Sequence, residues 1–158
     1  METQATKLLK QRKVPFEEHP YAYEHRGGTK VSARELGVPE HLVIKTLIMQ
    51  NEAREPLVVL MHGDCQVSTK ELARQIGMKK IEPCTPETAA RHTGYLVGGT
   101  SPFGTKRKMP VYLEKSVTDL PLIYINGGRR GYLISINPTD LIHVLQPTLV
   151  EVAQVSGD

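Results

Sequence analysis

Apolar residues recur along the chain at two spacings, and each spacing predicts one kind of secondary structure. Runs that are apolar at nearly every position, or at every second position, are typical of buried or half-buried strands. The clearest such run is Val43 to Met49, in which both alternating faces are mostly apolar. Seven strands are expected in all, at residues 16–19, 43–49, 56–61, 110–114, 122–126, 132–136 and 148–152.

Helices are indicated by the residues that begin and end them. Ser68 and Glu71 stand at capping-box spacing and Gly77 follows where a helix commonly ends, which predicts a helix between them. Thr85 and Pro86 predict the start of another helix. Further helices are expected around Ala5 to Leu9, ending before Val14, over Ser32 to Leu36, closed by Gly37, and from Asn137 to near Leu145.

These strands and helices mix without a regular alternation, which favours an α+β fold over a parallel α/β fold. We expect one compact domain over residues 1–158, with a mixed central sheet flanked by helices. The strands at 122–126 and 132–136 are close in sequence and separated by glycines. They predict a hairpin whose turn is Gly127 to Gly131.

Composition is that of an ordinary globular protein, with 39% hydrophobic and 23% charged residues. The formal net charge of +3 is too small to indicate nucleic-acid binding by itself, although basic residues gather beside glycines at 106–108 and 129–130. Cys65 and Cys84 lack metal-binding spacing and are expected to be reduced thiols. Short apolar runs and the lack of a signal-peptide core predict a cytoplasmic protein.

Four of the 13 glycines fall between Gly94 and Gly104. The segment fits neither the P-loop pattern nor the dinucleotide-binding pattern. Two interpretations remain open at this point: a tight structural corner, or a loop whose backbone amides approach a ligand. The basic run Lys106 to Lys108 directly after it, and the second glycine–arginine segment, favour amides and cations that face an anionic substrate.

Lys45 is unusual because it shares a strand face with Leu47 and Met49 in an apolar run. A buried ammonium group is costly unless it is paired or opens on a polar cavity. Lys45 is therefore either an edge-strand residue whose head reaches water, or a positive charge in a pocket wall. The histidines, cysteines and Ser101 form no recognisable nucleophile and base set.

Several strings resemble the YbaK/EbsC branch of the prolyl-tRNA synthetase editing-domain superfamily. They are IKTL at 44–47, TGYLVGGTSPFG at 93–104, IYINGGRRG at 123–131, INPTDL at 136–141, and the opening ATKLLKQRKVPFEEHPY. The resemblance implies a compact α+β domain with a mixed, barrel-like sheet. It also implies an enzyme that removes cysteine mischarged onto proline tRNA, with cysteinyl-tRNA(Cys) as a further substrate.

The resemblance assigns roles to named positions. The lysine of the KTL string falls on Lys45, and the expected catalytic set is Lys45, Gly98, Gly99 and Ser101. Substrate-binding positions are expected at Tyr21, Thr100, Pro102, Gly127 and Gly128. Lys106, Arg107, Lys108, Arg129 and Arg130 are expected to contact tRNA. Ser135 stands where relatives often have an acidic residue, and Asp140 lies where a helix start favours an acid.

The resemblance also implies a mechanism without a protein nucleophile, in which the substrate thiol attacks its own ester and releases a thiolactone. No cofactor or metal is expected. The expected partners are the 3′ end of an aminoacyl-tRNA and prolyl-tRNA synthetase. Two alternatives stay open: a deacylase for another small amino acid such as alanine or serine, and a catalytically silent tRNA-binding or regulatory homologue.

Overall fold

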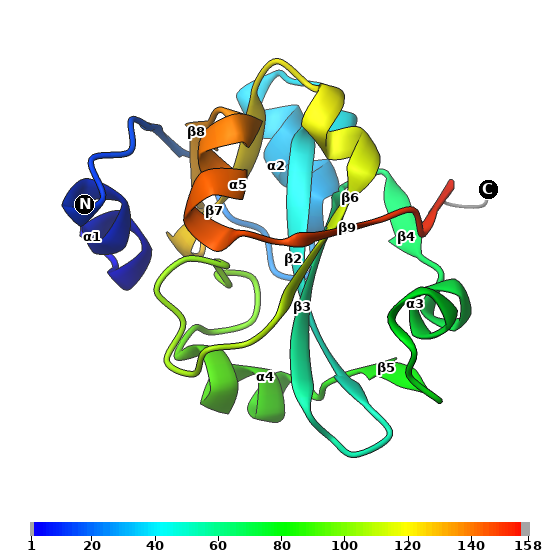
Figure 1. The fold of residues 1–158 in the computed structure, drawn as a ribbon. Helices are drawn as coiled ribbons and strands as arrows, with labels where there is room; N and C mark the ends of the chain where they lie inside the picture. The colour runs from blue at the N-terminus through cyan, green and yellow to red at the C-terminus, as the bar shows by residue number, and fades with distance from the viewer. Residues whose placement is uncertain (1, 156–158) are drawn as a thin grey trace.

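The two most apolar runs form the antiparallel pair β2 (Val43–Asn51) and β3 (Pro56–His62) at the centre of an eight-stranded sheet. The computed structural model describes residues 2–155 (Figure 1). β2 also pairs in parallel with β7 (Ile123–Arg129), and β3 pairs in parallel with β6 (Val111–Glu114). The mixed sheet of an α+β fold is therefore confirmed.

Short strands complete the sheet, in the order β1-β8-β7-β2-β3-β6-β9 with β5 paired to β2. They are β1 (Glu17–Pro20), β5 (Ile81–Pro83), β8 (Tyr132–Ile136) and β9 (Thr148–Val150). A separate two-stranded sheet joins β4 (Cys65–Val67) to β10 (Ala153–Val155). The strands β4, β5 and β10 are three residues long, too short to leave a periodic pattern, and the sequence did not predict them.

All five expected helices are present. They are α1 (Gln4–Gln11), α2 (Gly28–Leu36), α3 (Thr69–Ile76), α4 (Pro86–Thr93) and α5 (Pro138–Leu145), with 3-10 turns at η1 (Glu40–Leu42) and η2 (Lys115–Asp119). The Ser68 hydroxyl caps α3 by accepting from the Glu71 amide. The amide of Ser68 donates instead to the Val152 carbonyl, so half of the expected capping box forms.

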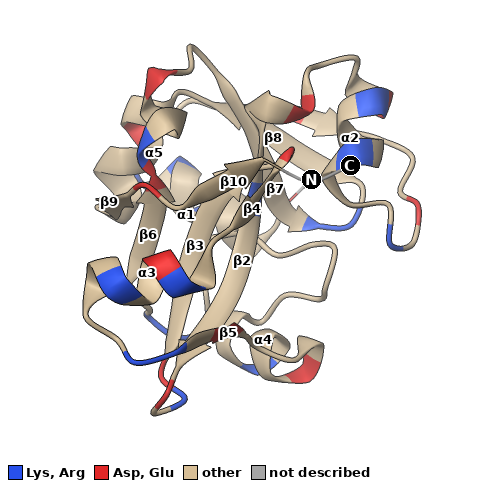
Figure 2. Ribbon diagram, turned by 90° about the vertical axis from the view of Figure 1, so that its right-hand side faces the viewer, with Lys and Arg blue, Asp and Glu red and all other residues tan. Residues whose placement is uncertain are grey.

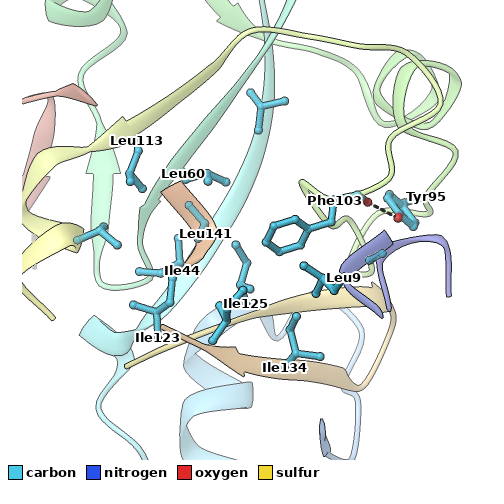
Figure 3. Close-up of a cluster of buried hydrophobic side chains, with 14 of the residues drawn as sticks. Leu9, Ile44, Leu60, Tyr95, Phe103, Leu113, Ile123, Ile125, Ile134 and Leu141 are labelled. Carbon is cyan, nitrogen blue, oxygen red and sulfur yellow. Dashed lines mark hydrogen bonds between the residues drawn. The ribbon is translucent and has the colours of Figure 1, made fainter. Parts of the chain in front are cut away.

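Both faces of the β2–β3 pair are covered, which explains why these strands are apolar throughout. One face contributes Ile44 and Leu60 to a core with Leu9 of α1, Phe103 and Leu141 of α5 (Figure 3). The other face packs its own cluster, which includes Leu72 of α3 and Val150 of β9. No helix within residues 2–155 is long and apolar enough to span a membrane.

The β7–β8 hairpin is confirmed, but its turn is shorter than predicted. Gly127 and Gly128 belong to β7, where they form a bulge between the pairs Asn126–Leu133 and Arg129–Tyr132. Only Arg130 and Gly131 make the turn. A Cβ atom at Gly127 would lie 2.6 Å from the Tyr132 ring, so the glycine is needed for close packing of the bulge.

Candidate functional site

A cavity of about 550 Å³ opens beside β2, between the start of α2, the start of α4 and the glycine-rich loop. We call it the main cavity. Four residues of the predicted site line it: Tyr21, Lys45, Gly98 and Thr100. They come from three separate segments of the sequence, and the fold brings them together around this cavity.

Lys45 pairs with Met61 of β3, whereas the pairs between β2 and β7 end at Ile44 and those between β2 and β5 begin at Met49. Lys45 therefore lies where β2 is paired on one side only, as the edge-strand interpretation expects, and it lines the main cavity, as the pocket-wall interpretation expects. Desolvation by burial lowers the pKa of Lys45, while the negative charges of Glu40 and Asp64 oppose this shift. Among residues 2–155 no carboxylate oxygen lies within 4.0 Å of its ammonium group. Lys45 thus offers the cavity a positive charge without a direct ion-pair partner in the described chain.

In the glycine-rich loop, one glycine is needed for close packing and another lines the main cavity. The Gly99 amide donates to the Leu96 carbonyl at 2.9 Å, and a Cβ atom at Gly99 would lie 2.8 Å from the Arg130 backbone nitrogen. Gly98 lines the main cavity with φ +87°. Its amide donates to no acceptor within residues 2–155. Of these two glycines, Gly98 is therefore the one that can donate to a ligand.

Other predicted residues do not line the main cavity. Ser101 is fully buried, and its hydroxyl oxygen accepts from the Phe103 amide at 3.1 Å. Pro102 is buried beside it, and Gly127 and Gly128 form the β7 bulge. Neither these four residues nor Gly99 is among the lining of the main cavity. A direct contact of any of them with substrate stays a prediction.

Asn126, which the sequence did not single out, connects the bulge to the loop. Its amide nitrogen donates to the Gly98 carbonyl at 3.1 Å, and its amide oxygen accepts from Gly128 and Arg129 at 2.7 and 3.0 Å. Asn126 also lines the main cavity. The glycines after Asn126 marked a turn or bulge whose amides a neighbouring side chain can satisfy, but nothing in the sequence placed Asn126 at the cavity.

Two further residues of the cavity wall carry reactive or unsatisfied groups. The Thr46 hydroxyl is buried and has no hydrogen-bond partner among residues 2–155. Its place directly after Lys45 in the IKTL string was the available signal. Cys84 is a free thiol, and burial raises its pKa. Cys84 is therefore mainly a neutral thiol near pH 7, which is a poor nucleophile.

The predicted tRNA-binding residues divide into two groups. Lys106, Arg107 and Lys108 are exposed, and the amides of Lys106 and Arg107 bind carbonyls at the end of α4. Arg129 and Arg130 are exposed at the β7–β8 turn, and Arg130 lines a second cavity. Figure 2 shows basic and acidic residues interspersed over the elements of that view, so the basic residues do not form one continuous positive surface there.

A group of possible metal ligands lies where β2 begins and β3 ends. His41, Asp64 and Cys65 place one donor atom each within 4.8 Å of one another, because the β2–β3 hairpin brings both of its ends together. The His41 Nδ1 and Asp64 Oδ1 atoms are already hydrogen-bonded at 2.9 Å. Cys65 donates to the same carboxylate at 3.6 Å. These contacts satisfy the three groups without an ion.

The remaining family positions have structural partners. The buried Ser135 hydroxyl is 2.8 Å from His19 Nε2, and Asp140 lies in the first turn of α5, which Asn137 caps. Asp140 therefore has the favourable place near a helix start that its position predicted.

Comparison with known proteins places this geometry in context. Residues 25–144 match the family model of the aminoacyl-tRNA editing domain. The chain is 30% identical over 152 residues to "Putative Cys-tRNA(Pro)/Cys-tRNA(Cys) deacylase EbsC" from Enterococcus faecalis, covering 95% of this chain and 92% of that protein. It is 29% identical over 86 residues to the proline–tRNA ligase of Brachyspira hyodysenteriae, which is 54% of this chain and 15% of the ligase.

Solved structures share the fold at low sequence identity. The chain resembles "a putative trans-editing enzyme for prolyl tRNA synthetase", with a TM-score of 0.83 at 21% identity over 98% of this chain and 99% of that one. It also resembles the hypothetical protein APE2540, with a TM-score of 0.88 at 20% identity over 96% of this chain and 100% of that one. Both likenesses support the fold alone.

Proposed function

The chain belongs to the aminoacyl-tRNA editing domain family, and on this basis we propose that it is a deacylase that removes mischarged cysteine from tRNA(Pro). The observation that carries the proposal is the lining of one cavity by Lys45, the unused Gly98 amide and Thr100. A cation and a backbone donor in one wall are suited to an ester whose carbonyl oxygen gains negative charge.

Each of these groups has a part in the proposed reaction. The Gly98 amide donates to the ester oxygen, and loss of such a donor typically costs about 2.7–4 kcal/mol of transition-state stabilisation. Lys45 orients the terminal adenosine and favours the thiolate form of a nearby substrate thiol. Gly99, Ser101, Pro102, Gly127 and Gly128 hold the loop and the bulge in register behind Gly98.

The nucleophile in this proposal is the substrate's own thiol. The substrate sulfur bonds to its own carbonyl carbon, the bond from that carbon to the ribose oxygen breaks, and this oxygen takes the proton that the thiol lost. The products are a cysteine thiolactone and uncharged tRNA, and water later opens the thiolactone to cysteine. The attack is intramolecular, so orientation supplies much of the acceleration. Burial raises the pKa values of both Cys65 and Cys84, which argues against a protein thiolate.

The partner in this proposal is the acceptor end of the tRNA. Lys106, Arg107, Lys108 and Arg129 contact its phosphates, and an enzyme that acts on mischarged tRNA works in the cytoplasm. Prolyl-tRNA synthetase is a candidate partner because part of a proline–tRNA ligase is similar to this chain.

A deacylation assay with a panel of charged tRNAs tests the proposal. Purified protein is incubated with cysteinyl-, alanyl- and seryl-tRNA(Pro), and with cysteinyl-tRNA(Cys), and release of the amino acid is followed. We expect fast release of cysteine and much slower release of alanine and serine. Faster release of alanine or serine would assign the other deacylase activity. Binding of tRNA without any release would make the chain a silent homologue.

A further inference from the structure

A second cavity of about 500 Å³ adjoins the main cavity. The two share several lining residues, which are Tyr21, Gly28, Pro86, Val97 and Gly98. The two cavities are therefore neighbours that border the same five residues. Gly98 is one of these shared residues and therefore lies between the two cavities.

The chemistry of the second cavity differs from that of the first. Tyr23, His25, Arg26 and Arg130 line the second cavity and are not part of the main cavity's lining. Glu24 also lines it, but this carboxylate is paired with Arg34 of α2. The balance of charge facing the second cavity is therefore positive, with an aromatic ring beside the cations.

Tyr23 is held in place from two sides. The Arg130 guanidinium carbon lies over the Tyr23 ring, 5.5 Å from its centroid, and Arg130 Nε donates to the Val97 carbonyl at 2.8 Å. A Cβ atom at Gly98 would lie 2.6 Å from the Tyr23 hydroxyl oxygen, so the loop backbone closes against the ring. The ring is thus fixed at the junction of the cavities, and a fixed aromatic ring loses little entropy when a base stacks on it.

We propose that the second cavity binds the nucleotide that precedes the esterified adenosine, a cytidine in tRNA, with its base stacked at Tyr23 and its phosphate near Arg26 and Arg130. This inference rests on the proposed function, which puts the aminoacyl-adenosine in the main cavity. An unpaired RNA end is bound by aromatic stacking combined with cations, and both are present here.

The placement separates two kinds of contact with tRNA. Lys106, Arg107 and Lys108 line neither cavity, so they are suited to phosphates farther along the acceptor end. The second cavity is the subsite next to the ester, and it contributes most to binding of a short, unpaired 3′ end. Recognition of one added nucleotide should therefore depend on Tyr23 and Arg130.

Binding of uncharged nucleotides tests the subsite without requiring catalysis. Adenosine and the dinucleotide cytidylyl-(3′→5′)-adenosine are titrated into the isotope-labelled protein, and affinities are taken from NMR shift changes. We expect the dinucleotide to bind about tenfold more tightly than adenosine, a gain within the range of one stacked base. Its added shift changes should map to Tyr23, Arg26 and Arg130.

Variants of the second cavity then test which residues produce the gain. Tyr23→Leu and Arg130→Ala should reduce the affinity ratio to below about threefold, whereas Tyr23→Phe keeps the ring and the ratio. Arg26→Ala provides a further variant in case Tyr23→Leu disturbs the loop. Arg54→Ala, in the β2–β3 turn away from both cavities, is the matched control and should keep the ratio.

The outcomes distinguish this inference from the function on which it rests. Equal affinities for adenosine and the dinucleotide, or a gain that survives in both Tyr23→Leu and Arg130→Ala, would overturn the subsite even if cysteinyl-tRNA is cleaved. A gain that depends on these residues supports the subsite as an RNA site. If the same protein then fails to deacylate any charged tRNA, the proposed function fails and the RNA site stands.

Discussion

The side-chain amide of Asn126 donates a hydrogen bond to the carbonyl oxygen of Gly98, over 3.1 Å. This contact joins the bulge of β7 to the glycine-rich loop, two segments 28 residues apart in the sequence. Because the other atom of the same amide accepts from Gly128 and Arg129, one side chain holds both the bulge and the peptide group that joins Gly98 to Gly99.

Replacing Asn126 should therefore impair activity more than stability. Asn126→Ala removes the donor to Gly98 and both acceptor contacts, which should cost on the order of 1–3 kcal/mol of unfolding free energy. Deacylation should fall at least tenfold, because the glycine-rich loop loses a bond that holds its backbone at Gly98, the residue proposed to bind the ester. Asn137→Ala is the matched control, since it removes the cap of α5 at a similar cost of about 1 kcal/mol, away from the cavity. Equal activity losses in the two variants would contradict a positioning role for Asn126.

Lys45→Ala should abolish deacylation and leave the fold intact. The half-buried ammonium faces the main cavity without an ion-pair partner in the described chain, so its removal leaves no opposite charge behind. Single-turnover assays and thermal melts of Lys45→Ala are compared with those of Lys10→Ala on the surface of α1. The proposed role does not survive if Lys45→Ala retains activity within about threefold of wild type, well under the tenfold that 1.36 kcal/mol represents.

The basic run after the glycine loop should determine part of the salt dependence of tRNA binding. Replacing Lys106, Arg107 and Lys108 with alanine should weaken binding and reduce the slope of log affinity against log salt. Each lost phosphate contact should contribute about 0.7 to 0.9 to that slope. Lys79→Ala/Lys80→Ala, in an exposed segment before β5, is the control. An unchanged slope in the triple variant would show that the run is merely a solvated loop.

Stability should fall as the pH drops below about 6.5, because burial lowers the pKa of His62 below its ordinary value. As the pH falls, the unfolded chain gains a proton on this histidine before the folded chain does, so acid favours unfolding. In the folded state His62 Nδ1 lies 2.9 Å from the His41 carbonyl, Nε2 lies 2.7 Å from the Ser116 hydroxyl, and the ring stacks on His41 at 3.7 Å.

Urea unfolding at pH 7.5 and 5.5 measures this effect. Wild type should lose stability between the two values, and His62→Asn, which retains a donor near the His41 carbonyl, should lose less. An identical loss in both proteins would assign the acid sensitivity to other groups.

Local signals in the sequence predicted the helices well, because caps such as Ser68 and Thr85 act within one turn. The sequence also predicted the long strands. Because β2 and β3 are apolar on both faces, it indicated that both faces of this pair are covered. It could not predict the β4–β10 pair, because Cys65 and its partner Val155 are far apart in the sequence. The glycines Gly127 and Gly128 are compatible with either a turn or a bulge. Only their close packing against Tyr132 and Tyr95 in the fold decides between these two structures.

Some residues of the candidate site could likewise be predicted from the sequence, and others could not. Lys45 stood out because a charge in an apolar strand is costly, and in the structure it lines the main cavity. Asn126 could not be recognised as a cavity residue, because its contact with Gly98 depends on how the hairpin packs against the loop. The split between Gly98, which faces the cavity, and Gly99, which packs on the Arg130 backbone, depends on the same tertiary contact.

The most direct test of the proposed reaction is to identify its first product. The Cys65→Ala/Cys84→Ala variant, which contains no protein thiol, is mixed with cysteinyl-tRNA(Pro), quenched at short times and examined by mass spectrometry. We expect activity close to wild type and a cysteine thiolactone that appears before free cysteine, because the substrate thiol attacks its own ester. Free cysteine as the first product, with no cyclic species at any time point, would contradict this mechanism and indicate attack by water.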